Sequence, residues 1–506
     1  MSDSYLHTRR SFLESAAVLA ATAVMPRAAA AASESGRLID LSALEAVAHM
    51  SRGELTCERY ATALIERCRA ARALNAFITF EPERVLAAAR ACDKARHAGR
   101  PAGPLFGLPI PVKDSVNTAE YPTTAGTPAL RHFRPAEDAP VVAALRSSGA
   151  IVLGKTNLHE LSYGWTSNNL AFGAVHNPYD PRRIPGGSSG GTGAAVAARM
   201  APLGVAEDTE GSIRVPAAFC GIMGFRPTTG RYSTRACVPI TSLFDQVGPH
   251  ARTVADLALF DSVVANDWQP LAAVPLRGVR LGIVRDYWYR DLDPEVERIT
   301  QAALGRLRDA GVELVESELP GLARLIDLST EPVQNHDVRL TLARYLEEYR
   351  AGVTFEALVR QASPDIRELF RTDVLPGGQN FVTDAAYAEA VGTHLPVLRR
   401  LYRDFFDRTG VAAIVFPATL VPALPIGSEG DVTIREETVS FETAVARNIA
   451  PGSTAGLPGL VLPAGLTSTG LPVAIELDAP AGSDRALLAL GANVAEIIGG
   501  VPPPRM

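Results

Sequence analysis

Gly186-Gly187-Ser188-Ser189-Gly190-Gly191 is the stretch from which the rest of this chain is best understood. Two short segments accompany it: Pro-Val-Lys-Asp at 111–114 and Gly-Ser-Ile-Arg at 211–214. A serine hydroxyl needs a base to attack a carbonyl at neutral pH, and a neutral amine within hydrogen-bond reach can be that base. Ser188 and Ser212 are 24 residues apart, which leaves room for one helix and one strand, so both loops can return to one edge of a sheet. The three segments predict a serine hydrolase that uses a lysine.

Lys113 ends an apolar run that begins at Leu108. Burial disfavours a charged ammonium, so a lysine held in such a run can supply a neutral amine that accepts a proton. The same lysine could instead extend from a strand end to solvent, with only its aliphatic stem buried. The position of Lys113 alone does not separate these two interpretations.

The segment 186–193 holds five glycines around its serines and Thr192. Glycine-rich turns before helices also bind phosphate groups. The phosphate-binding pattern that ends in Lys-Ser or Lys-Thr is absent here, because residues 192–194 read Thr-Gly-Ala. We therefore favour a loop that supplies serine hydroxyls to an acyl-transfer site.

Ser212 precedes a helix expected over 212–220. The first N–H groups of a helix lack partners within it and can bind the oxyanion of a tetrahedral intermediate. An ordinary serine N-cap would explain Ser212 on its own. The order of the three segments favours the catalytic interpretation.

Strands and helices alternate along the chain. We expect helices from Ser42 onward (a capping box with Glu45) and over 57–72, 82–98, 138–148, 193–200, 212–220, 294–310 and 483–498. We expect strands ending at Lys113 and over 150–153, 203–205, 279–284, 312–318, 411–416, 459–462 and 472–476. This alternation predicts an α/β sheet with helices on both faces. Residues 320–408 are mostly helical in pattern, and no repeat or long linker divides residues 38–506, which predicts one domain.

Residues 1–31 are predicted to be separate from this fold. The pair Arg9-Arg10 precedes a mildly apolar run over 16–25, and four alanines at 28–31 offer small residues for cleavage. This pattern is typical of a twin-arginine signal peptide, and the run is too short to span a membrane as a stable helix. We therefore expect a periplasmic or secreted protein with no stable membrane anchor. A disordered alanine-rich tail is the alternative.

The composition fits a globular enzyme. A chain of 506 residues, 47% of them hydrophobic, can bury a large core. A net charge of −6 argues against a nucleic-acid partner. The five cysteines are scattered and show no CxxC or His/Cys ligand spacing, so neither a disulfide framework nor a metal site is expected. The chemistry above needs no metal or other cofactor.

The ordered segments resemble the amidase signature family, whose hallmark is a glycine- and serine-rich loop followed by a Gly-Ser-Ile-Arg-like nucleophile segment. Further family-like stretches lie at 107–114, 166–173, 215–221 and 245–249. The similarity runs from about Leu38 to the C-terminal helix. It implies the amidase signature fold, with a mixed central β-sheet flanked by helices on both faces, and a small-molecule amide as substrate.

Carried over by position, the resemblance implies a Ser-Ser-Lys triad. Ser212 would be the nucleophile, Ser188 the bridging serine (usually on a cis peptide in this family) and Lys113 the base. Lys113 would take a proton through Ser188 as Ser212 attacks, and Ser188 would then protonate the departing ammonia or amine. The oxyanion hole would consist of the backbone N–H groups of Thr209, Glu210, Gly211 and Ser212.

Residues 206–212 depart from the family's usual Gly-Thr-Asp-Thr-Gly-Gly-Ser and read Ala-Glu-Asp-Thr-Glu-Gly-Ser. Both Ala206 and Glu207 differ, but Glu210 replaces a glycine beside the expected oxyanion hole. A side chain restricts the backbone there, and a carboxylate opposes a developing oxyanion unless it points away or pairs. Arg214 could serve as such a partner.

Within the family, residues 153–178 look most like indoleacetamide and mandelamide hydrolases. The resemblance thus implies an amidase for small carboxylic amides, in particular aryl-substituted acetamides, which it converts to the acid and ammonia. Residues 320–408 are expected to shape the acyl pocket. The sequence leaves open whether the chain is a monomer or a homodimer.

Two rival functions stay open. One is the A subunit of a tRNA-dependent amidotransferase, against which an export signal argues because the tRNA machinery is cytoplasmic. The other is a non-catalytic binding protein disabled by Glu210, against which the intact Lys113, Ser188 and Ser212 argue.

Overall fold

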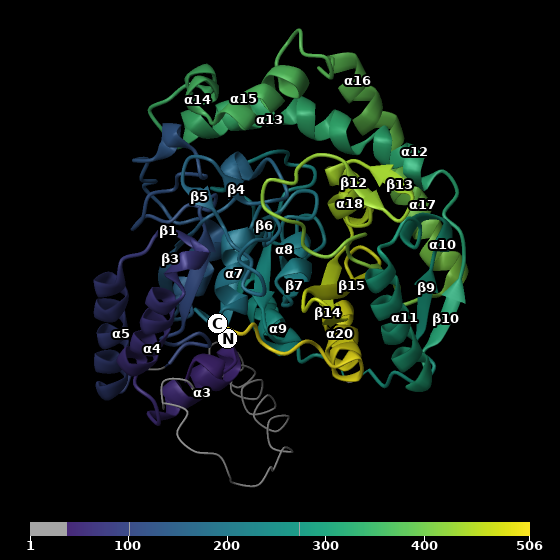
Figure 1. The fold of residues 1–506 in the computed structure, drawn as a ribbon. Helices are drawn as coiled ribbons and strands as arrows, with labels where there is room; N and C mark the ends of the chain where they lie inside the picture. Colours follow the sequence, from purple (N-terminus) through teal and green to yellow (C-terminus); the bar gives the residue numbers. More distant parts are fainter. Residues whose placement is uncertain (1–37, 101, 273) are drawn as a thin grey trace.

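A mixed sheet forms the centre of the computed structural model, which describes residues 38–100, 102–272 and 274–506 (Figure 1). Among these residues, eleven strands form that sheet in the order β1-β3-β2-β6-β8-β7-β14-β15-β11-β9-β10. They are β1 (Phe77–Thr79), β2 (Pro109–Lys113), β3 (Ile151–Thr156), β6 (Leu203–Asp208), β7 (Met223–Arg226), β8 (Gln246–Ala251), β9 (Arg280–Ile283), β10 (Glu313–Glu316), β11 (Ala413–Pro417), β14 (Gly459–Leu466) and β15 (Pro472–Asp478). Two short hairpins pair β4 (Asn168–Asn169) with β5 (Gly173–Ala174), and β12 (Val432–Ile434) with β13 (Glu437–Val439).

Helices separate most of these strands along the chain. They are α3 (Ala43–Arg52), α4 (Cys57–Ala70), α5 (Pro82–His97), α6 (Pro140–Ser147), α7 (Gly190–Ala197), α8 (Arg214–Phe219), α9 (Val254–Val264), α10 (Arg285–Trp288), α11 (Pro294–Asp309), α12 (Leu322–Asp327), α13 (Thr330–Glu348), α14 (Phe355–Gln361), α15 (Pro364–Leu369), α16 (Asp384–Glu389), α17 (Leu395–Thr409), α18 (Phe441–Ala446), α19 (Ala450–Ala455) and α20 (Asp484–Ile498). Two π-helical turns, η4 (Phe370–Val374) and η5 (Ala390–His394), follow α15 and α16. The capping box expected at the first helix is confirmed, since Ser42 and Glu45 each accept a hydrogen bond from the other's backbone N–H.

The sheet is mixed and covered on both faces. Strand β2 is parallel to β3 and β6, whereas β8, β7, β14 and β15 continue the sheet in antiparallel pairs. Every residue of β2, β3, β6 and β8 is buried. Because successive side chains of a strand point to opposite faces, burial of all of them requires cover on both sides. Helix α7 packs on β2 and β6, α9 on β7 and β8, and α11 and α20 on β14, which confirms the predicted α/β fold.

Strands β7 and β8 and the start of helix α7 differ from the sequence-based expectation. Strands β7 and β8 were not anticipated, and Pro249 within β8 argues against a central strand because it cannot donate to the ladder. Helix α7 begins at Gly190, three residues before the expected start at 193. A Cβ at Gly191 would lie 2.3 Å from the carbonyl oxygen of Asn157, so a glycine is needed where the first turn of α7 approaches this loop.

Helices α12 to α17, drawn in green in Figure 1, lie across one end of the sheet. None of the described helices combines the length and apolar character needed to cross a membrane. The expected export signal at 1–31 lies outside the described residues, so periplasmic localisation stays a prediction.

Candidate active site

Lys113, Ser188 and Ser212 come from three segments that meet at one end of the sheet. Lys113 is the last residue of β2, Ser188 lies in the glycine loop before α7, and Ser212 lies in the turn between β6 and α8. Lys113 and Ser188 are fully buried, and Ser212 is 5% exposed. The structure thus brings together the three side chains that the sequence singled out.

The lysine and the first serine are in direct contact. Lys113 Nζ donates to Ser188 Oγ at 2.7 Å, and the Gly187–Ser188 peptide bond is cis, as the resemblance implied. Ser212 Oγ makes no hydrogen bond within the part of the chain that the structure describes. Catalytic hydrogen bonds often tighten only once substrate is bound. The hydrogen bond between Lys113 and Ser188, the first step of the expected relay, is therefore formed. Among the described residues, no hydrogen bond joins the hydroxyls of Ser188 and Ser212.

The glycine loop is held by the neighbouring segment at 166–169. Ser167 Oγ lies 2.9 Å from the carbonyl oxygen of Gly186 and 3.1 Å from that of Ser188, and it accepts from Gly190 N at 3.0 Å. A Cβ at Gly190 would lie 2.4 Å from this hydroxyl. One buried serine therefore fixes the backbone on both sides of Ser188, and it requires a glycine beside it.

A buried carboxylate shapes the turn that presents Ser212. Asp208, at the end of β6, accepts from Gly211 N at 2.7 Å, from Ile213 N at 2.9 Å and from Arg214 Nε at 3.1 Å. Burial alone would raise the pKa of Asp208, but Arg214 and these donors hold it at about 2. Gly211 has a φ of +112°, which a residue with a side chain adopts only with strain. The turn is therefore fixed by a charged Asp208 and a glycine.

The N–H groups expected to form an oxyanion hole are not equivalent. The N–H of Gly211 is donated to Asp208. Those of Thr209, Glu210 and Ser212 have no acceptor among the described residues. These three N–H groups are the ones available to an oxyanion beside Ser212.

Glu207, which the sequence marked only as a departure from the family pattern, contacts the lysine. Its Oε2 accepts from Lys113 Nζ at 2.9 Å, from Ser162 Oγ at 3.0 Å and from Ser115 Oγ at 3.2 Å. Glu207 is 3% exposed and Lys113 is fully buried. The interpretation in which Lys113 reaches solvent is therefore wrong. The interpretation in which Lys113 has only apolar surroundings is incomplete, because its amine forms a buried ion pair with Glu207.

Glu210 does not pair with Arg214, so the pairing considered from the sequence is wrong. Arg214 instead forms buried ion pairs with Asp208 at 3.1 Å and with Glu476 at 2.7 Å. Glu210 Oε2 accepts from Gln334 Nε2 at 2.6 Å. Burial raises the pKa of Glu210 well above its usual range, which favours the neutral acid. A neutral Glu210 does not repel an oxyanion formed nearby.

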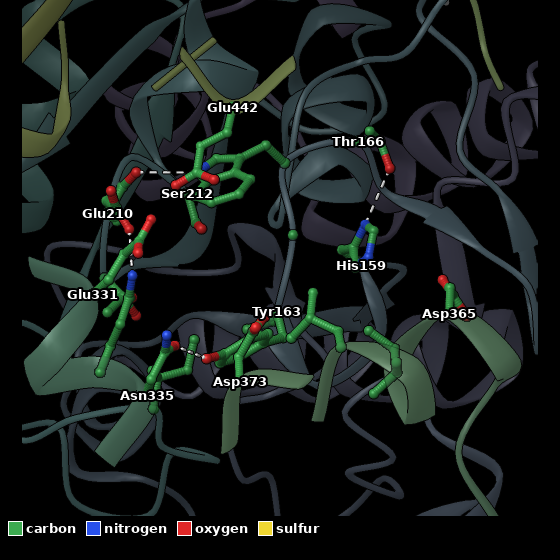
Figure 2. Close-up of a pocket in the computed structure, with 18 of the residues that line it drawn as sticks. His159, Tyr163, Thr166, Glu210, Ser212, Glu331, Asn335, Asp365, Asp373 and Glu442 are labelled. Atoms are coloured by element: carbon green, nitrogen blue, oxygen red, sulfur yellow. Dashed lines mark hydrogen bonds between the residues drawn. The ribbon is translucent and has the colours of Figure 1, made fainter. Parts of the chain in front are cut away.

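A cavity of about 320 Å³ lies in front of Ser212 (Figure 2). Loops at the end of the sheet form one wall, and α13, α15 and η4 form another, so residues within 320–408 do line it. Its apolar and aromatic side chains are Tyr163, Trp165, Ile240, Ile366, Leu369 and Phe441. Its carboxylates are Glu210, Glu331, Asp365, Asp373, Glu429 and Glu442. Of these twelve lining residues, Glu210 is the one that the sequence analysis named individually.

Known proteins match this chain along almost its whole length. The family model described as Amidase matches residues 59–488. The indoleacetamide hydrolase of Agrobacterium vitis is 37% identical over 458 residues, which cover 90% of this chain and 97% of the relative. The mandelamide hydrolase of Pseudomonas putida is 37% identical over 482 residues, which cover 92% of this chain and 93% of the relative.

A solved structure agrees with these sequence matches. The crystal structure of an amidase superposes with a TM-score of 0.79 at 30% identity, covering 89% of this chain and 98% of that protein. The glycine loop, the Ser212 turn and Lys113 all lie within the matched range 59–488. The chain therefore belongs to the amidase signature family and is a hydrolase that acts on amide bonds.

Proposed function

We propose that this enzyme hydrolyses a small primary amide of an aryl-substituted carboxylic acid to the acid and ammonia. Ser212 is the nucleophile, Ser188 the bridging serine and Lys113 the base. The observation that carries this chemistry is the 2.7 Å hydrogen bond between Lys113 Nζ and Ser188 Oγ beside the cavity that Ser212 lines.

Lys113, which pairs with Glu207 in the structure, must first release a proton to solvent so that it enters the relay as a neutral amine. Ser188 gives its proton to this amine and takes the proton of Ser212, whose Oγ attacks the amide carbon. The free N–H groups of Thr209, Glu210 and Ser212 stabilise the resulting oxyanion. Ser188 then returns a proton to the departing ammonia, and water releases the acid from the acyl-enzyme by the same relay.

The aryl preference is supported by the cavity wall and by the relatives. Tyr163, Trp165 and Phe441 contribute aromatic side chains to the cavity. The names of the indoleacetamide and mandelamide hydrolases both describe amides of aryl-substituted acids. An aryl group buried against such a wall is removed from water, which favours binding.

Ammonia release from a panel of amides tests this function. The panel holds indole-3-acetamide, mandelamide and phenylacetamide against propionamide and butyramide. We expect kcat/KM to be at least about tenfold higher for the aryl amides, because burying such a group contributes about 1.5–3 kcal/mol. Equal values for both groups would remove the aryl part of the proposal. No turnover of any amide by folded protein would overturn the function itself.

The Glu207→Gln variant is expected to keep the glycine loop in place but to lose stability. Glutamine keeps an acceptor for Ser115 and Ser162, but it removes the charge that pairs with Lys113 Nζ at 2.9 Å. Removing one member of a buried ion pair should lower the unfolding free energy by about 3–5 kcal/mol, which urea unfolding measures. An unchanged unfolding free energy would show that the charge of Glu207 does not stabilise the fold.

A further inference from the structure

His159 lies in the wall of the cavity that Ser212 lines (Figure 2). It follows β3 and directly precedes the short turn η3 (Glu160–Ser162). Its backbone N–H donates to the carbonyl oxygen of Ser188 at 3.1 Å, and the residue is 7% exposed. A group bound to the His159 ring would therefore lie beside the loop that carries the bridging serine.

The imidazole ring of His159 is fixed by two neighbours. Its Nδ1 lies 3.0 Å from Thr166 Oγ1. A Cβ at Gly164 would lie within 2.7 Å of Nε2, Cε1 and Cδ2, so a glycine is needed where the chain packs against the ring. Within residues 38–100, 102–272 and 274–506, Nε2 has neither a hydrogen-bond partner nor an ion-pair partner. Nε2 is thus the ring nitrogen that is left for a ligand.

The surroundings of Thr166 decide which nitrogen of His159 carries the proton. Thr166 is buried, and its Oγ1 accepts from Asn168 N at 3.1 Å. Apart from His159 Nδ1, the described residues offer the Thr166 hydroxyl no acceptor. Because a buried hydroxyl without an acceptor is costly, Thr166 donates to Nδ1. Burial also lowers the pKa of the His159 imidazole, so the ring is neutral and its proton is on Nε2.

The polar ends of two aromatic side chains in the same wall are already engaged with the protein. Tyr163 Oη donates to Asn335 Oδ1 at 2.6 Å, and Trp165 Nε1 donates to the carbonyl oxygen of Glu210 at 3.2 Å. The Nε2–H group of His159 differs from both, since it is a donor in the cavity wall that a ligand can use.

Acceptors without a partner lie on the same side of the cavity. Asp365 Oδ1 is buried and has no hydrogen-bond partner in the described part of the chain. The charges of Glu429 and Asp365 act on the His159 ring, although neither carboxylate pairs with it there. A group that only accepts hydrogen bonds would bring its oxygen atoms up to these carboxylates. A hydroxyl fits better, because it accepts from Nε2–H and can donate to a carboxylate oxygen.

We propose that the amide hydrolysed at Ser212 carries a hydroxyl group on its acyl part, and that this hydroxyl accepts a hydrogen bond from His159 Nε2. The inference rests on the proposed function, because it adds one polar group to the substrate of that same site. The leaving group of a primary amide is only ammonia, so the hydroxyl must belong to the acyl part. His159 then determines specificity and takes no part in the proton relay.

Three pairs of amides that differ by hydroxyl against methyl test the proposal. They are mandelamide with 2-phenylpropanamide, each as single enantiomers, 3-hydroxyphenylacetamide with 3-methylphenylacetamide, and 4-hydroxyphenylacetamide with 4-methylphenylacetamide. In at least one pair we expect kcat/KM to be about 10- to 100-fold higher for the hydroxyl member, because a methyl group leaves the buried donor without a partner. The preferred pair also gives the position of the hydroxyl.

The outcomes of this comparison separate the inference from the function on which it rests. Ammonia release from the methyl members with no preference for hydroxyl in any pair would overturn the inference and leave the amidase function standing. No release from any of the six amides by folded protein would overturn the proposed function as well.

Variants assign the preference to His159. In His159→Phe, which keeps a ring but removes the donor, the ratio of kcat/KM between hydroxyl and methyl members should fall by about tenfold or more. His132→Phe is the matched control, because His132 is exposed and does not line the cavity, and its ratio should stay unchanged. An unchanged ratio in His159→Phe would place the hydroxyl elsewhere and overturn the assignment.

The position of the ring proton gives a second test, which needs no altered cavity. In ¹⁵N NMR spectra of the unaltered protein labelled at histidine, we expect His159 to show an unprotonated Nδ1 and a protonated Nε2. Signals that are missing in Thr166→Val or in His159→Phe identify this ring. A proton on Nδ1 instead would mean that Nε2 is no donor, which would overturn the proposed hydrogen bond.

Discussion

Replacing Ser212 by alanine is expected to abolish amide hydrolysis by this enzyme. We expect kcat to fall on the order of 10⁵- to 10⁶-fold, the size seen when a serine hydrolase loses its nucleophile. Ser188 cannot take over, because it is fully buried, is held by Lys113 at 2.7 Å and does not line the cavity. The measurement is ammonia release under single-turnover conditions, with an amide that the unaltered enzyme hydrolyses.

Ser468→Ala is the matched control for this experiment. Ser468 is exposed in the loop between β14 and β15 and is remote in sequence from the glycine loop. We expect this control to retain full activity. If Ser212→Ala kept more than about a tenth of the activity, a loss far below that expected for a nucleophile, Ser212 would not be the nucleophile.

Replacing Lys113 by methionine is expected to have two separable effects. The first is catalytic, because loss of the base should lower kcat by about 10²- to 10⁴-fold. The second is structural: Glu207, which is 3% exposed, would be left as a buried charge without a partner. Breaking a buried pair in this way costs about 3–5 kcal/mol of unfolding free energy. Urea unfolding measures the second effect and ammonia release the first.

The double variant Lys113→Met/Glu207→Gln distinguishes a catalytic lysine from a structural one. Removing both charges should restore most of the unfolding free energy, since no buried charge then lacks a partner. Activity should stay at the low level of Lys113→Met, because glutamine supplies no base. Recovery of activity together with stability would mean that Lys113 serves only to neutralise Glu207.

Much of the fold was predictable because its signals are local. The helix at 57–70 and the one at 294–309 are amphipathic and have clear N-caps, so their positions followed from residue pattern. Strand β8 was missed because Pro249 makes its local pattern unlike a central strand, yet pairing with β6 and β7 on either side holds it there. Tertiary pairing overrode the local signal.

The pairing of Glu207 with Lys113 could have been suspected only with the sheet order in hand. Val112 on β2 pairs with Val205 on β6, so the ends of these two strands lie side by side. A carboxylate at the end of one strand then faces an amine at the end of the other. Residue spacing along the chain carries no information about which strands are neighbours.

The sequence by itself determined the family and singled out Lys113, Ser188 and Ser212 as candidates, because each lies in a short segment whose chemistry is set by its immediate neighbours. Only the tertiary structure decided how these residues are surrounded. It placed Glu207 beside Lys113 and lined the cavity with residues between 159 and 442. The physical reason is that charge and burial depend on what packs together in space. Strand order and helix packing bring those side chains into one cavity, and no local pattern records that arrangement.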